Sequence, residues 1–175
     1  MIKGQDIVLL VKLITNKEAR KWGQVKLSQH LCVSSSTVNA SLQKLRKSKL
    51  IVDSWGTIRN HTPVKANCKE FIPCIRYVWP ANKAGMTVGM FTGSWLTSSN
   101  GLMIPGGSDV WPDAEGKDRG FELTPLYPSV PRSLRLYPDQ PFYKMLCLID
   151  RLRDHKSTGI EDVREQLTKR IEECL

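Results

Sequence analysis

Polar side chains that can read the edges of base pairs are concentrated in residues 34–49. Short, uncharged side chains lie away from the apolar positions of this segment: Ser35, Ser36, Asn39, Ala40 and Gln43. Asn and Gln can each form two hydrogen bonds with adenine, and Ser can bond several bases. A helix that presents these side chains would suit the major groove of double-stranded DNA.

Basic residues accompany the uncharged ones. Lys44, Arg46, Lys47 and Lys49 cluster at the end of the segment, and no Asp or Glu occurs in residues 32–51. Such cations hold phosphates and set the register of a protein on DNA. Because a solvated helix face usually carries Glu as well as Lys, the absence of acid favours a polyanionic partner.

The net charge of +9 is unevenly distributed along the 175 residues. Residues 1–80 contain 14 Lys and Arg against four Asp and Glu, whereas residues 81–175 contain 12 against 13. A basic module joined to a near-neutral one is typical of a protein that binds a polyanion and carries a second module. Charge alone leaves open a basic, solvated surface without a partner.

The elements that would position these side chains are two helices joined by a tight turn. The spacing of apolar residues predicts helices over 26–31 and 34–48, with the turn at 32–34. Ser34 is a suitable N-cap of the second helix, because its hydroxyl can accept the free N–H groups of the first turn. The order resembles the helix-turn-helix of bacterial repressors, but Cys32 stands where Gly is usual, at a turn that favours positive φ.

A β-hairpin wing is predicted directly after this unit. Residues 50–52 and 57–59 read as strands around a turn at residues 53–56. Arg59 in this wing could reach the phosphate backbone or the minor groove. The residues that we expect to contact DNA are Ser34, Ser35, Ser36, Thr37, Asn39, Ala40, Gln43, Lys44, Lys47, Lys49 and Arg59.

The remaining chain predicts a mainly α fold with a small β component. Helical periodicity indicates helices over residues 3–15, over 63–77 with Pro73 kinking it, and after residues 140 and 159 as an antiparallel pair. The segment between residues 80 and 141 is rich in Gly and Pro and reads as largely irregular, with short strands in residues 86–96. We therefore expect a winged helix-turn-helix domain over residues 1–79. Residues 80–175 would form an irregular segment and a C-terminal helical hairpin for dimerisation or partner binding.

Much of the chain resembles a known family of small bacterial proteins. The opening residues 1–10, Tyr77–Pro80, Leu123–Pro131 and Leu148–Arg153 are similar to segments of the MarR-like winged-helix regulators. The resemblance implies a sequence-specific transcriptional regulator, most often a repressor. It assigns no role to the later motifs.

The sequence gives little support for catalysis or for metal binding. There is no P-loop and no Gly-x-Ser-x-Gly motif, so we expect no enzyme and no cofactor. His61, Cys68 and Cys74 match no common zinc spacing. The acidic residues at positions 109, 113, 115 and 118 could bind a cation, although a solvated loop is the simpler interpretation. The segment Pro125–Pro131 could be a polyproline-type ligand or a structural strap.

The location is inferred from the lack of a secretory signal and of a membrane-spanning run, and the partners are inferred from the helix-turn-helix. Five cysteines without a secretory signal, and no apolar run long enough for a bilayer, predict a cytoplasmic protein without a membrane contact. Helix-turn-helix proteins commonly dimerise, so we expect a homodimer on double-stranded DNA. An alternative function is that of an antitoxin, in which the C-terminal half grips a partner protein and the chain also represses its own promoter.

Overall fold

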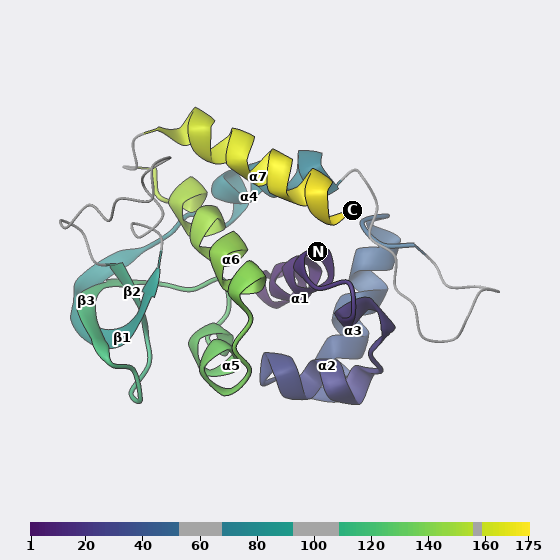
Figure 1. Ribbon diagram of the computed structural model, residues 1–175, viewed down its shortest axis with the longest axis horizontal. Helices are drawn as coiled ribbons and strands as arrows, with labels where there is room; N and C mark the ends of the chain where they lie inside the picture. Colours follow the sequence, from purple (N-terminus) through teal and green to yellow (C-terminus); the bar gives the residue numbers. More distant parts are fainter. Residues whose placement is uncertain (53–67, 93–108, 156–158) are drawn as a thin grey trace.

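The computed structural model describes residues 1–52, 68–92, 109–155 and 159–175 (Figure 1). Within these ranges there are seven α-helices, one short 3-10 helix and three strands. The elements follow the order α1 (Gly4–Thr15), η1 (Ala19–Lys21), α2 (Gln24–Leu31), α3 (Ser35–Lys47), α4 (Cys68–Val78), β1 (Lys83–Thr92), β2 (Asp109–Pro112), β3 (Asp118–Leu123), α5 (Val130–Leu136), α6 (Gln140–Arg153) and α7 (Ile160–Cys174). The mainly helical fold class with a small β component is confirmed.

Helix α1 is the centre of the molecule. Every residue from Asp6 to Ile14 is buried, including both of its charged side chains, Asp6 and Lys12. A helix that is buried on all sides must contact several neighbours, and α1 packs against α3, α6 and α7. Figure 1 shows α1 and α6 between the sheet at one end of the molecule and α2 and α3 at the other.

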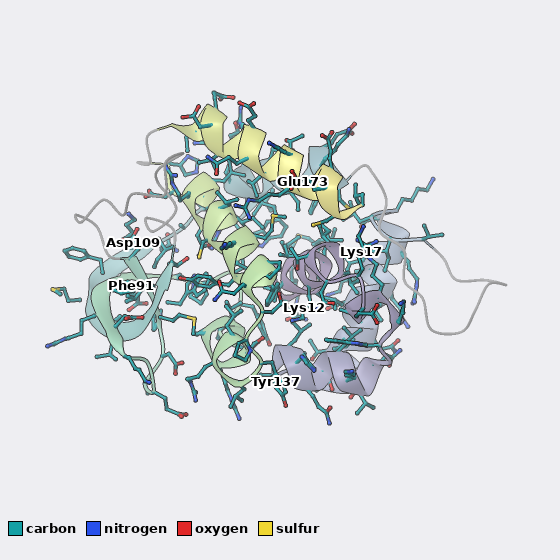
Figure 2. All side chains as sticks on the ribbon, in the orientation of Figure 1. Lys12, Lys17, Phe91, Asp109, Tyr137 and Glu173 are labelled. Atoms are coloured by element: carbon teal, nitrogen blue, oxygen red, sulfur yellow. The ribbon has the colours of Figure 1, made fainter. Side chains whose placement is uncertain are left out.

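One hydrophobic cluster contains residues from both predicted parts of the chain. It joins Leu27, Val38 and Leu45 to Phe142, Ile149 and Leu167. A buried ion pair crosses the same boundary, because Lys12 Nζ of α1 lies 2.8 Å from Oδ2 of Asp139, the N-cap of α6. Lys12 is labelled in Figure 2. Burial raises the pKa of Asp139, but hydrogen bonds from Lys12, the Phe142 N–H and Asn16 outweigh it and lower the pKa overall. The two parts therefore share a core.

The middle of the chain is more regular than its composition predicts. Strand β1 alone has ten residues, and each of the three strands pairs with the other two: β1 antiparallel to β2 and β3, and β2 parallel to β3. Helix α5 follows as a further regular element. The first half of β1 is exposed on both faces, so the sequence does not alternate there as a half-buried strand does. The short strands predicted in residues 86–96 agree with the part of β1 from residue 86 to residue 92, whereas the expectation of an irregular segment is wrong for residues 83–85, 109–112, 118–123 and 130–136.

The predicted wing is only partly within the described residues. Ile51 forms a single β-bridge, but residues 50–52 do not form a strand. The turn at 53–56, the second strand at 57–59, and Arg59 lie outside the described residues, as do residues 63–67 of the next predicted helix. Within the described residues that helix covers Cys68–Val78 and continues through Pro73.

The predicted strap packs on the molecule. Leu126 and Tyr127 are partly buried against the core. A Cβ on Gly4 would lie 2.0 Å from the carbonyl oxygen of Leu126, so only glycine allows α1 to begin so close to this segment. No helix in the described ranges is long and apolar enough to cross a membrane.

Candidate nucleic-acid interface

Helices α2 and α3 are joined by the tight turn that the sequence predicts. At the end of α2, the N–H of Val33 donates to Ser28 O at 3.0 Å and the N–H of Cys32 donates to Gln29 O at 3.1 Å. This pair of bonds is a Schellman motif, which needs a left-handed residue in its middle. Cys32 supplies it, with φ 53° and ψ 45°. The turn therefore forms without glycine, in a backbone conformation that is costly for cysteine.

Helix α3 begins with the predicted cap. The Ser34 hydroxyl accepts a hydrogen bond from the N–H of Thr37 at 3.1 Å, and its oxygen also lies 2.8 Å from the hydroxyls of Ser36 and Thr37. The cap satisfies an N–H group that the helix itself leaves unbonded. Ser34 therefore orders the first turn of α3 as predicted, and Thr37, selected only as a DNA contact, takes part in the same cap.

A buried carboxylate fixes α3 against α1. Asp6 is fully buried and accepts hydrogen bonds from the Ser41 hydroxyl and, at 2.7 Å, from the backbone N–H of Lys3. Its third partner is Lys44, whose Nζ lies 3.2 Å from Asp6 Oδ2. Together with the buried Val38, Leu42 and Leu45, this network holds one face of α3 on the core. Lys44, predicted to contact phosphate, is therefore engaged within the protein.

The opposite face of α3 is exposed to solvent. Apart from Ser35 at its first position, the exposed residues of α3 recur at intervals of four, three and four: Ser36, Ala40, Gln43 and Lys47. These intervals are the spacing of one helix face, and we call these four residues the outer stripe. The outer stripe contains two hydrogen-bonding side chains, a small residue that allows close approach, and a cation.

Two other predicted base contacts face α2. The Ser35 and Ser28 hydroxyl oxygens are 3.1 Å apart, where α2 and α3 cross. Asn39 Oδ1 accepts a hydrogen bond from Gln24 Nε2 at 3.2 Å. Lys49 directly follows Ser48, the C-cap of α3, and has a left-handed backbone conformation like that of Cys32, with φ 57°. The structure thus divides the predicted residues into an outer stripe and a set that orders the helix-turn-helix.

Sequence reasoning missed the residues that hold the far side of α2. The Ser129 hydroxyl donates to Leu31 O at 2.7 Å, and the Ser133 hydroxyl donates to His30 O at 2.6 Å. These hydroxyls satisfy carbonyls of the last turn of α2, which lack helical partners. Ser129 is the N-cap of α5 and Ser133 lies within that helix. Both belong to a segment that was predicted to form the other part of the chain, and no spacing in the sequence connects them to α2.

His30 lies in an aromatic stack between the helix-turn-helix and α5. Its ring centroid is 4.3 Å from those of Trp22 and Tyr137, of which Tyr137 is labelled in Figure 2. Burial lowers the pKa of His30, and the positive charges of Lys12 and Lys26 lower it further. The stack therefore favours a neutral imidazole that packs between rings.

The candidate metal sites of the sequence are accounted for by other contacts. Arg135 pairs with Asp113 at 3.0 Å and with Glu115 at 2.7 Å, and Lys83 pairs with Asp109 at 3.0 Å. The buried thiol of Cys68 donates to Leu50 O, and the exposed thiol of Cys74 donates to Glu70 O. His61 is outside the described residues. Within them, no group of three or more His, Cys, Asp or Glu side chains could hold a metal ion.

The outer stripe has no acidic neighbour on its own two helices. Neither α2 nor α3 contains Asp or Glu, and the nearby Asp6 is buried and paired.

A comparison of the chain with protein-family models, curated proteins and solved structures finds no match.

Proposed function

We propose that this protein binds double-stranded DNA sequence-specifically and regulates transcription, most simply as a repressor. The observation that supports this most strongly is the outer stripe: an exposed, acid-free helix face with Ser36 and Gln43 flanked by Lys47. In this proposal α3 enters the major groove with its N-terminal part nearest the bases. Ser36 and Gln43 contact base edges, and Lys47 contacts a phosphate.

The attachment of α3 suits such a role. A recognition helix must present its side chains in one orientation, because base contacts depend on hydrogen-bond geometry. The Asp6 network, the buried apolar stripe and the Ser34 cap restrain α3 at several points along its length. The side chains of the outer stripe therefore project from a fixed backbone.

The proposed assembly is a homodimer whose two α3 helices meet successive major grooves about 34 Å apart. The apolar side chains of α7 are buried within the chain, so a C-terminal interface would have to use polar faces of that helix. Static light scattering gives the mass in solution, and a monomer both free and on DNA would contradict this part of the proposal.

The first test is fluorescence anisotropy with the DNA upstream of the protein's own gene and a scrambled duplex of equal composition. The proposal expects binding to the upstream DNA to be tighter by about 10³-fold or more at physiological salt. Equal, steeply salt-dependent affinities would leave only a non-specific basic module. Binding to neither duplex would overturn the proposal.

The second test separates base contact from charge. Gln43→Ala removes an exposed amide without changing charge, and Gln166→Ala on α7 is the matched control. We expect Gln43→Ala to reduce the preference for the upstream DNA about 5- to 100-fold, because one good base contact contributes about 1–3 kcal/mol of discrimination. Gln166→Ala should leave that preference unchanged. Equal effects from the two variants would show that the outer stripe does not read bases.

A second candidate function, binding of a partner protein by the C-terminal half, is favoured by one observation. Met86, Val88 and Phe121 are 66%, 38% and 52% exposed. Met86 and Phe121 are cross-strand neighbours of β1 and β3, so they lie on one face of the sheet. An antitoxin could use this face without losing its DNA contact. A protein that co-purifies in fixed stoichiometry and is released by Phe121→Ser would support this function.

A further inference from the structure

A polar groove lies between the helix-turn-helix and α5. It has a volume of about 390 Å³ and is open to solvent. One wall comes from α2 and its turn, including Gln29, Cys32 and Ser34, and the other comes from α5, including Arg132 and Tyr137. No residue that lines it is acidic. The groove therefore begins beside the cap of α3, which is the end of that helix closest to the bases in the proposed complex.

Helix α5 is held in this position by specific contacts. The hydroxyls of Ser129 and Ser133 donate to the last carbonyls of α2, and Ser133 is buried. The ring of Tyr137 stacks on His30 of α2. Contacts before, within and after α5 thus fix its backbone against α2, and Arg132 projects from this fixed helix.

The two arginines of α5 differ in their partners. Arg135 forms ion pairs with Asp113 and Glu115. Arg132 is exposed, and in the described part of the chain no carboxylate lies within ion-pair distance of it. Burial raises the pKa of the Cys32 thiol, whereas the positive charges of Arg132 and Arg135 both oppose this shift, which places both guanidinium groups near the turn. Arg132 therefore adds uncompensated positive charge beside the helix-turn-helix.

We infer that Arg132 of α5 is part of the DNA interface and binds a backbone phosphate next to the bases that α3 contacts. A guanidinium suits this role because it stays charged and can bond two phosphate oxygens. The C-terminal half of the chain then contributes directly to DNA binding, through a surface continuous with the α2–α3 turn. This inference rests on the proposed function.

The test compares Arg132→Ala with Arg135→Ala across a salt series on the upstream and scrambled duplexes. One lost phosphate contact should reduce the slope of log K against log salt by about 0.9. We expect Arg132→Ala to show that reduction and to weaken binding to both duplexes to a similar degree, about 5- to 10-fold at low salt. Arg135→Ala should keep the wild-type slope, because its charge is already compensated within the protein.

The outcomes separate the inference from the proposed function. Arg132 is exposed, so thermal melting of Arg132→Ala should match that of the wild type, and Arg132→Lys should restore most of the slope. Wild-type binding with an unchanged slope in Arg132→Ala would overturn the inference and leave the proposed function in place. A reduced slope in both alanine variants would also overturn it, because that result would reflect general charge. Failure of the wild type to bind either duplex would overturn both.

Discussion

Helices α3 and α7 each bury one apolar stripe and expose the rest of their surface. Val38, Leu42 and Leu45 are buried in α3, and Val163, Leu167 and Ile171 are buried in α7. The outer faces differ. Helix α7 exposes Glu and Asp together with Lys, and Arg164 pairs with Glu161 at 3.0 Å. Helix α3 exposes Ser, Ala, Gln and Lys and contains no acid.

The difference shows which part of an amphipathic helix carries information about partners. The buried stripe explains why each segment is a helix and which way it faces, and in this respect the two are equivalent. The outer face of α7 carries charges of both signs, with Arg164 paired to Glu161, and suits water. The outer face of α3 leaves its positive charge uncompensated and therefore suits a polyanion.

The largest expected effect is on the free energy of unfolding and concerns how α3 and α7 are attached to the rest of the protein. Asp6→Ala should lower the free energy of unfolding by about 3 kcal/mol, because it leaves the buried Ser41 hydroxyl and the Lys44 ammonium without their carboxylate. Glu161→Ala, in the first turn of α7, removes a carboxylate that is 81% exposed and should change the free energy of unfolding by less than about 0.5 kcal/mol. Thermal melting measures both, with an expected fall of roughly 10 °C for Asp6→Ala. Equal shifts would contradict a special attachment of α3.

The next effect tests the outer faces directly. Lys47→Glu on α3 and Lys169→Glu on α7 make the same charge change at exposed positions. Lys47→Glu should weaken DNA binding by about 10- to 100-fold on both the upstream and the scrambled duplex, because a phosphate contact is replaced by repulsion. Lys169→Glu should change it less than about twofold in the same anisotropy assay. A similar loss in both variants would mean that net charge, and not the face of α3, determines affinity.

The sequence predicted α1, α2, α3, α6 and α7 because each has a clear apolar period, and it predicted the Ser34 cap from local chemistry alone. It could not separate Gln43 from Asn39. Both lie off the apolar stripe, and only the crossing of α2 over α3 shows that Asn39 bonds Gln24. The Ser129 and Ser133 contacts to α2 span about a hundred residues of sequence, so no local pattern reveals them. The predicted strands at residues 86–96 overlap β1, but its first residues and its pairing with β2 and β3 were not predicted, because β1 exposes both faces over half its length.

The smallest expected effect is on stability and concerns the backbone conformation before α3 and at the start of α7. Cys32, in the turn before α3, and Gly159, at the start of α7, both have left-handed φ values, 53° and 69°. An L side chain is costly in this conformation and glycine is not. Cys32→Gly should therefore stabilise the protein by about 0.5–1 kcal/mol relative to Cys32→Ala, which removes the thiol but keeps the Cβ. Gly159→Ala should destabilise it by about 1 kcal/mol.

The two stability changes have opposite signs because one substitution introduces glycine at a left-handed position and the other removes it. Denaturation with urea can measure both. The Cys32→Ala control separates the backbone effect from loss of the partly buried sulfur, so the informative quantity is the difference between the glycine and alanine variants. If Cys32→Gly is no more stable than Cys32→Ala, the left-handed turn is not a source of strain. A more stable Cys32→Gly variant with unchanged DNA binding would show that the helix-turn-helix tolerates the strain of cysteine without needing it for its contacts. A more stable variant with weaker binding would instead show that the cysteine turn sets the orientation of α3.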